Sequence, residues 1–591
     1  MRMSDVDTDF KTIKANGFNT VVLAIPWAEF QPVFEPCCLY NDVAFQKLDL
    51  IMQKAEAIDL KVLFRLGYLW SFDPTQQAPG MERSYMPFTD DRALEAFAKL
   101  ARRLADRVQP YKYFSFAFLS WEDFFLHGLF LEENRAKTQN TVLETQYKYF
   151  LRETFSLQQL REFFPNQRII SYDDVPFPVS EVTTKNGDSR LVLFHRFWDY
   201  LLIERLFKHI LSVFPRLTME VRIDGDRFIT ENSDLKWLRH FDSYEIPQSD
   251  IVVGYYAPFW GMQNKRDFIG SNRAIEQLRV LIQEMREHSK KRNVFIDQLN
   301  FFDETPGFED SIRIYPNQIN QFLSDAAVVL SSSVGYSLWT LKDYVHSYLY
   351  NASFQKEFKG WVTKGNPGIL RKNQFDRTLL MKSGDQVSQE IPSWRGIELP
   401  EKIQARFCLD AGARSRDFAG YVTVGNEKEK FHTALKPFSG NHACWNSALP
   451  SDGSVFTMGV EKGTIEIETL YLFKFLYKSE LYPFHGEKEG EYLRGIRELN
   501  RQLLSFAPDD HYQEPGRTPN VTGIFEDNWL DRCQEALKID PLSGANIDPP
   551  PGLKITQNRY FSFSSIFPPL EFQCARRCVS PSVCNFRREY L

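Results

Sequence analysis

Carboxyl-bearing side chains stand next to aromatic ones directly after several apolar runs of this sequence. Glu122 and Trp121 follow "YFSFAFLS", and Asp297 and Gln298 follow "NVFI". Cleavage of a glycosidic bond needs two carboxyl groups: one protonates the leaving oxygen, and the other attacks the sugar or activates water. Flat aromatic rings can stack on the apolar faces of a sugar ring. These residue types therefore predict chemistry on a saccharide.

The same association recurs where the other apolar runs end. A lone acidic residue there is also typical of a solvated loop start, and a lone Trp is typical of rim packing, so the hypothesis depends on their joint occurrence on several runs. The further residues in such positions are Trp27, Arg65, Trp70, Asp224, Asp226, Tyr255, Tyr256 and Trp339.

Other reaction classes lack their signatures in this sequence. It has no cluster of His, Cys and Asp at metal-ligand spacing, no glycine-rich phosphate loop and no Gly-x-Ser-x-Gly elbow. We therefore expect neither a metal nor a cofactor. A net charge of −6 over 591 residues does not favour a nucleic-acid partner, and no apolar run is long enough to span a bilayer. The oligomeric state stays open.

The segments around these side chains alternate between the hydrophobic patterns of strands and of helices. Apolar runs such as "FNTVVLAIPW" and "KVLFRLGYLW" read as buried strands, and amphipathic stretches with capping residues, such as the one after Asn41-Asp42, separate them. Repeated strand–helix alternation predicts a parallel sheet with helices outside it. Seven good strands point to a (β/α)8 TIM barrel that lacks a visible first strand. In such a barrel all the strand-end residues share one rim.

The pattern changes after the barrel region. Short alternating runs such as "GYVTVGN" and "VFTMGV", separated by turn residues, predict a β-sandwich. We divide the chain into a TIM-barrel domain (1–350), a jelly-roll β-sandwich (351–480), a helix with a small extra module (481–540) and a disordered tail (541–591). The sandwich is expected either to bind glycan or to support the barrel.

The cysteines and the N-terminal residues give an expectation for the cellular compartment of the protein. Eight Cys without paired CxxC spacing predict free thiols in a reducing cytosol. The first ten residues lack the apolar segment of a signal peptide, so the cytoplasm is the default expectation. The missing first strand suggests a truncated start, which would also remove such a peptide.

Residues 11 to about 361 resemble the clan A glycoside hydrolases, the retaining (β/α)8 enzymes that include cellulases and β-galactosidases. "KANGFNTVVLAIPWAEFQP" looks like their second strand, "FRLGYLW" is similar to the Arg-Pro-Gly-Pro-Tyr segment of β-galactosidases, and "GYSLWTLKDY" looks like the eighth strand. "YNASFQKEFKGW" is similar to the opening of many carbohydrate-associated jelly-roll modules.

The resemblance implies roles for individual residues. Glu122 takes the place of the acid/base after strand four, with Trp121 where the family commonly has Asn. The nucleophile position at the end of strand seven falls on Asp297 or on Gln298, depending on a one-residue shift, and Glu304 is a loop carboxylate that could substitute. Tyr255 or Tyr256 fits the strand-six tyrosine that contacts the nucleophile. Arg65, Trp27, Trp70 and Trp339 would line the sugar site.

Two hypotheses follow from the residues. The first is a glycosidase that cleaves an oligo- or polysaccharide with Glu122 as the acid/base and Asp297 either as a nucleophile, with retention, or as a base that orients water, with inversion. The second is a catalytically inactive carbohydrate-binding protein, motivated by the departure from Glu at strand seven. The sugar, the linkage and the endo or exo mode depend on loop shape around the rim and are not predicted.

Overall fold

The computed structural model describes most of the barrel and sandwich regions. The described residues are 3–34, 38–68, 80–120, 141–177, 189–221, 226–229, 235–238, 251–256, 268–289, 293–299, 301, 313–338, 348–391, 402–410, 417–425, 428–432, 436–439, 442–450, 453–474, 484–485, 488–489 and 492–506.

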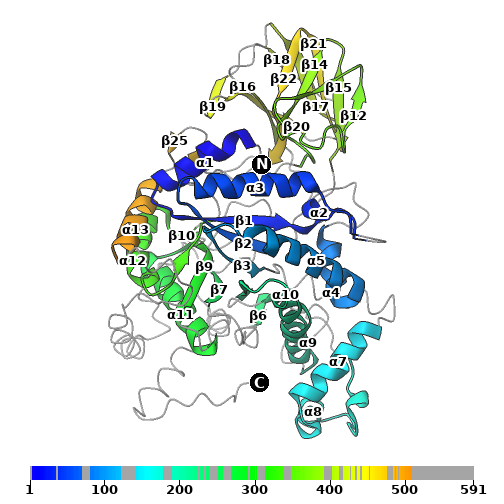
Figure 1. Cartoon of the computed structure of the whole chain (residues 1–591), viewed down its shortest axis with the longest axis vertical. Helices are drawn as coiled ribbons and strands as arrows, with labels where there is room; N and C mark the ends of the chain where they lie inside the picture. Colours follow the sequence, from blue (N-terminus) through cyan, green and yellow to red (C-terminus); the bar gives the residue numbers. More distant parts are fainter. Residues whose placement is uncertain are drawn as a thin grey trace, which may run out of the picture.

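Seven parallel strands form one curled sheet at the centre of the molecule (Figure 1). Their order in the sheet follows their order in the chain, as the strand–helix alternation predicts, and this is the arrangement of a (β/α)8 barrel. In the sheet they run β1 (Thr20–Pro26), β2 (Lys61–Tyr68), β3 (Phe114–Leu119), β4 (Leu217–Val221), β7 (Ile251–Tyr256), β9 (Asn293–Leu299) and β11 (Gly335–Tyr336).

Helices lie around the outside of this sheet, and the two helices over 141–154 and 157–163 are farther from it than the others (Figure 1). The expected caps are present: Asn41 accepts a hydrogen bond from the Ala44 amide at 3.4 Å and Asp90 one from the Arg92 amide at 2.9 Å. The helices are α1 (Met3–Ala15), α2 (Trp27–Phe30), α3 (Asp42–Glu56), α4 (Gly80–Thr89), α5 (Asp91–Val108), α7 (Thr141–Thr154), α8 (Leu157–Phe163), α9 (Ser189–Tyr200), α10 (Lys208–Leu211), α11 (Ser271–Ser289) and α12 (Ile319–Leu330).

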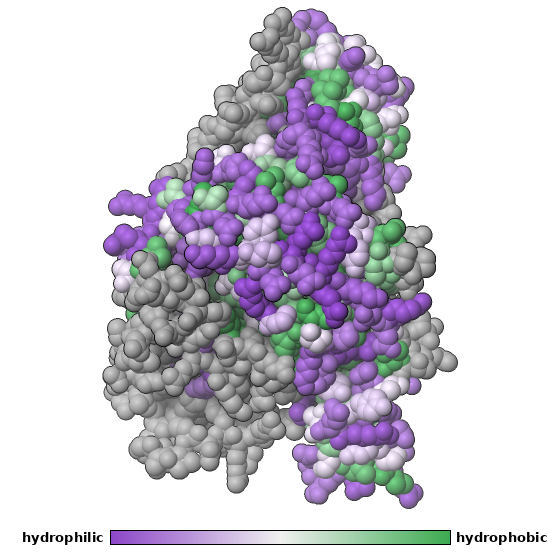
Figure 2. Space-filling model, in the orientation of Figure 1, coloured by the Kyte–Doolittle hydropathy of each residue, from purple (hydrophilic) through white to green (hydrophobic). Residues whose placement is uncertain are grey.

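The surface over α1, α3 and α5 is mainly hydrophilic (Figure 2), as expected for helices that turn one apolar stripe toward a sheet. None of the helices in the described part of the chain combines the length and the apolar character needed to cross a membrane.

Strands β2, β3, β7 and β9 divide their side chains between two cores. On β2, Val62, Phe64 and Leu66 belong to the large outer core beneath the helices, whereas Leu63 packs with residues of β3, β7 and β9 in a smaller core inside the curl. This alternation has the period of two that a strand imposes. It therefore tells which side chain of each strand points into the barrel.

Antiparallel strands between β11 and the last helix form a β-sandwich, as predicted (Figure 1). Its sheets enclose a separate apolar core. One sheet holds β12 (Val362–Lys364), β15 (Gln386–Glu390), β21 (Val455–Lys462), β17 (Ala419–Val424) and β18 (Lys428–His432). A second holds β13 (Gly368–Arg371), β14 (Arg377–Lys382) and β22 (Thr464–Ile467), and a third holds β19 (Lys436–Ser439), β20 (His442–Pro450), β16 (Lys402–Asp410) and β23 (Thr469–Lys474). The jelly-roll strand order within it stays a prediction.

Helix α13 (Leu493–Phe506) follows the sandwich in sequence but packs on the barrel, against α12 (Figure 1). Its Asn500 ties the two ends of the curled sheet together. The Asn500 amide donates to the carbonyl of Asn16, just before β1, at 2.9 Å, and the Tyr336 hydroxyl of β11 donates to Asn500 Oδ1 at 2.5 Å. The sandwich is thus inserted between the last barrel strand and a helix that covers the barrel.

Asp376 of the sandwich docks that domain onto the barrel. Its carboxylate accepts hydrogen bonds from the backbone amides of Met3 (2.8 Å) and Ser4 (2.9 Å), the first residues of α1. Asp376 is buried, and the neighbouring Phe375 belongs to the barrel's outer core. An acidic side chain from residue 376 therefore caps the first helix of the chain.

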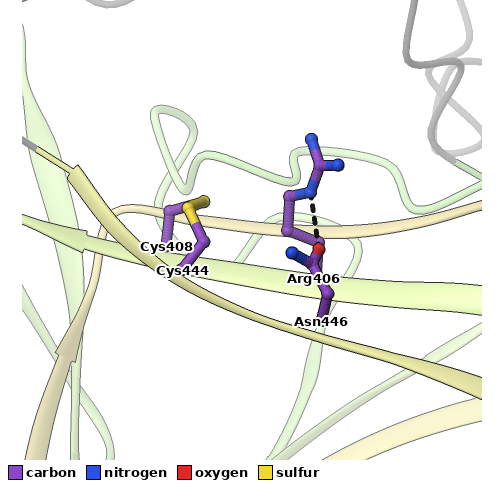
Figure 3. Close-up of a disulfide and its surroundings, with 4 residues drawn as sticks. All are labelled: Arg406, Cys408, Cys444 and Asn446. Carbon is purple, nitrogen blue, oxygen red and sulfur yellow. Dashed lines mark hydrogen bonds between the residues drawn. A yellow bond between two sulfur atoms is a disulfide. The ribbon is translucent and has the colours of Figure 1, made fainter. Parts of the chain in front are cut away.

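Two cysteines of the sandwich form a disulfide, so the expectation of free thiols is wrong for this pair. Cys408 on β16 lies directly opposite Cys444 on β20, and the two are bonded (Figure 3). Beside them, Arg406 Nε donates to Asn446 Oδ1 at 2.7 Å. Facing strands bring Cβ atoms within bonding range of a disulfide, which a sequence separation of 36 residues does not reveal.

Candidate functional site

Aromatic side chains pack together inside the curled sheet. Phe116 and Phe118 of β3 meet Phe295 of β9, with ring centroids 5.9 and 6.5 Å apart, and Leu63 and Val253 complete the layer. These rings and aliphatic side chains form an apolar layer inside the sheet. Polar side chains next to this layer therefore lie in surroundings of low polarity.

Polar side chains replace apolar ones one step further along each strand, toward its carboxyl end. Because inward positions alternate, Arg65 follows Leu63, Ser120 follows Phe118 and Asp297 follows Phe295. We call this set, with its contacting neighbours, the Arg65 cluster. Its members are Arg65, Ser120, Glu220, Asp297, Gln298 and Ser337.

Arg65 is the centre of this cluster. Its Nη2 donates to Ser120 Oγ at 2.8 Å, and the Ser120 hydroxyl donates to Glu220 Oε2. The guanidinium lies at nearly equal distances from two carboxylates: Nη2 is 3.6 Å from Glu220 Oε2, and Nε is 3.8 Å from Asp297 Oδ2. The positive charge of Arg65 is thus shared between the carboxylates of Glu220 and Asp297.

Asp297 is the inward-facing residue at the end of β9. Its Oδ1 accepts a hydrogen bond from Ser337 Oγ at 2.8 Å. Tyr255 of β7 pairs with Asp297 but Tyr256 pairs with Leu299, so Gln298 is the extra residue of a bulge, with φ of 57°. The sequence left open which residue of 297 and 298 takes this place, and the structure turns the Asp297 carboxylate toward Arg65.

Gln298 nevertheless joins the cluster from its bulged position. With its side-chain amide oriented so that the oxygen faces Arg65, it accepts hydrogen bonds from Nη1 and Nη2 at 2.5 and 2.9 Å. Its backbone amide donates to Ser337 Oγ at 3.2 Å. Gln298 therefore helps to fix the guanidinium and the hydroxyl that holds Asp297.

The charges of the cluster are deeply buried, with Arg65, Glu220 and Asp297 each 2% exposed. Removing three charges from water costs several kcal/mol for each ion, and their mutual attraction recovers this only with good geometry. Apolar residues would fill the same space at less cost. Buried charges at the carboxyl end of barrel strands, at positions where apolar residues would be less costly, are typical of a functional site.

Several predicted site residues lie outside the described residues. These are Trp70, Trp121, Glu122, Trp339 and the alternative carboxylate Glu304. For Tyr255 the structure describes only the backbone, which pairs with Asp297.

Trp27 and Tyr256 both lie on the helix side of the sheet. The Trp27 ring packs against Phe97 of α5, with centroids 4.9 Å apart, and its Nε1 donates to Gln31 Oε1 at 2.6 Å. Tyr256 donates its hydroxyl to the Ala274 carbonyl of α11 at 2.8 Å, and burial raises its pKa well above the usual value. Both follow the outward phase of their strands, so the structure does not bring either side chain to the Arg65 cluster.

Sequence reasoning missed Glu220, Ser120 and Ser337. Glu220 stands within the segment "LTMEV", whereas the predicted carboxylates Asp224 and Asp226 stand beyond its end. The missed signal was the alternation itself: Leu217 and Met219 belong to the outer core, so Thr218 and Glu220 must face inward. No group of three or more metal-binding side chains gathers anywhere among the described residues.

Several solved structures have a similar arrangement. They include a β-galactosidase from the psychrophilic Marinomonas ef1 (11% identity, TM-score 0.40, 58% of this chain and 53% of that chain). GH5_18 from Streptomyces cattleya in complex with GlcNAc also matches (13%, 0.35, 57% and 66%). A further match is TmCBM61 in complex with β-1,4-galactotriose (17%, 0.16, 22% and 99%). The chain thus spans about half of the β-galactosidase. No known family model matches the sequence, and no curated protein does.

Proposed function

We propose that the protein is a glycosidase that cleaves an oligo- or polysaccharide at the carboxyl end of its barrel, with Asp297 and Glu122 as the two carboxyl groups. The observation that carries the proposal is the placement of Asp297. It faces inward at the end of a barrel strand, beside a buried guanidinium, where (β/α)8 enzymes hold their reacting groups.

Asp297 is the nucleophile in this proposal. The hydroxyl of Ser337 and the charge of Arg65 hold its carboxylate in one orientation and favour its ionised form. The ionised oxygen attacks the anomeric carbon, and water later releases the sugar from the resulting ester. Retention of configuration follows from these two displacements.

Glu122 is the proton donor and then the general base. Ser120, whose hydroxyl joins Arg65 to Glu220, is the last described residue before it, and its amide donates to the Leu66 carbonyl at 2.9 Å. Two peptide units reach at most about 7 Å. This supports a position for Glu122 near the same end of the sheet as Asp297. The aromatic residues Trp70, Trp121, Tyr255 and Trp339 are proposed to stack on the sugar.

Kinetics of two isosteric variants test the proposal. On a panel of aryl glycosides, Asp297→Asn and Glu122→Gln should each lower kcat/KM by at least about a thousandfold, since each removes a group that reacts with the substrate. Asp417→Asn is the matched control, because Asp417 is an exposed sandwich residue paired with Lys462. Wild-type turnover in either site variant would refute the assignment.

A carbohydrate-binding protein without turnover is the second candidate, and one observation favours it. The Asp297 carboxylate is 2% exposed and engaged by Ser337 and Arg65, whereas a nucleophile must reach its substrate. Calorimetry on a glycan panel separates the candidates. Binding with no product from any glycan supports the second, and release of a reducing sugar supports the first.

A further inference from the structure

We propose that Glu220 is a positioning residue that draws Arg65 away from Asp297 and thereby sets how readily Asp297 takes up a proton. The proposal rests on the proposed function for its kinetic consequence, and on the geometry of the Arg65 cluster for everything else. Glu220 is a buried carboxylate on β4, two strands away from β9 in the sheet.

The first step is the shared guanidinium. Arg65 lies 3.6 Å from Glu220 and 3.8 Å from Asp297, and its hydrogen bond to Ser120 lies on the Glu220 side. Because Ser120 in turn donates to Glu220, Glu220 and Ser120 hold one side of the guanidinium, while Gln298 accepts from its Nη1 and Nη2 on the β9 side. The guanidinium is therefore shared between Glu220 and Asp297.

The charges near Asp297 affect how readily its carboxylate takes up a proton. Arg65 from β2 is a described cation beside Asp297, and Glu220 from β4 contacts the same guanidinium; Ser337 and Gln298 are uncharged neighbours, and the backbone of Tyr255 on β7 pairs with Asp297. Ionised Glu220 repels the ionised form of Asp297 and also takes up part of the attraction of Arg65. Both effects favour a proton on Asp297. Without the charge on Glu220, Asp297 should release its proton at lower pH.

The test follows the titration of Asp297 directly in the full chain. Carboxyl 13C resonances of aspartate-labelled protein are recorded against pH, with Asp297→Asn identifying the signal. In Glu220→Gln the midpoint should move to lower pH by about one unit or more, because a like charge is removed from buried surroundings in which charges are weakly screened. Glu220→Asp keeps the charge and should stay closer to wild type. An unchanged midpoint in Glu220→Gln would overturn the proposal.

Ser120→Ala is the second variant, since a buried Glu220→Gln could fail to fold. It removes only the hydroxyl that holds Arg65 on the Glu220 side, so the guanidinium is freed to approach Asp297 and the midpoint should fall by a smaller amount. A rise, or no change, would count against the proposal. Glu468→Gln is the matched control, because Glu468 is a similarly buried glutamate in the sandwich, and its midpoint for Asp297 should equal that of wild type.

Kinetics give an independent readout. In an active enzyme the acid limb of the pH profile of kcat/KM should move with the titration midpoint in Glu220→Gln. If the wild-type protein releases no sugar from any glycan, the proposed function fails, while the resonance titration still decides the role of Glu220. If the protein is active and only the Asp297 midpoint fails to move, the role of Glu220 fails and the function stands.

Discussion

Asp376 should contribute more to stability than an ordinary surface carboxylate, because it caps a helix that begins 373 residues earlier in the chain. Asp376→Ala removes the acceptor of two backbone amides of α1, those of Met3 and Ser4. Hydrogen bonds to a charged group contribute about 1.5 kcal/mol or more each, and loss of an N-cap costs up to about 2 kcal/mol. We expect Asp376→Ala to lower the unfolding free energy by about 3 kcal/mol.

Asp376→Asn retains one oxygen acceptor but loses the charge near the positive end of the helix dipole, so its loss should be about half as large. The assay is denaturant unfolding followed by far-UV circular dichroism, with hydrogen exchange of the α1 amides as a local readout. Exchange should accelerate first in the opening turn of α1.

Asp7→Ala is the control for this prediction, since Asp7 lies on the same helix and makes an exposed ion pair with Lys54 at 2.5 Å. Exposed pairs contribute at most about 1 kcal/mol. If Asp376→Ala destabilises the protein no more than Asp7→Ala, and α1 exchange is unaffected, then the cap does not hold the domains together and the reasoning is refuted.

Two further predictions concern the sandwich and the barrel strands. Cys408→Ser with Cys444→Ser should lower stability by up to about 4 kcal/mol, the chain-entropy limit for a loop of this length; an unfolding midpoint that is the same with and without reductant in wild type would contradict it. Lys61 has its pKa lowered to about 8 by burial. Because the unfolded chain then binds more protons above pH 8, wild type should gain stability between about pH 8 and 10.5 relative to Lys61→Met; a flat difference across that window would contradict it.

Much of the barrel was predictable because its strands and helices are indicated by patterns among residues close together in the sequence. Alternating strands, amphipathic helices and the caps Asn41 and Asp90 depend on near neighbours in the sequence. Within the candidate site, the sequence places Asp297 and Arg65 at strand ends, and the structure brings these two side chains together.

What could not be predicted depends on contacts between distant residues or on backbone detail. The bulge at Gln298 is a left-handed conformation at a residue that carries a side chain, so no glycine marked it. The cap from Asp376 to α1 and the return of α13 to the barrel join segments hundreds of residues apart. Glu220 was missed for another reason: its strand's alternation was readable, but only residues beyond the strand end were considered.

The most direct test of the central claim is the distance between the carboxyl groups of Glu122 and Asp297 in a crystal structure. The account predicts that both face the same end of the barrel, about 5 to 5.5 Å apart, as a retaining pair requires. A separation beyond about 9.5 Å, or a Glu122 side chain directed away from the Arg65 cluster, would contradict it.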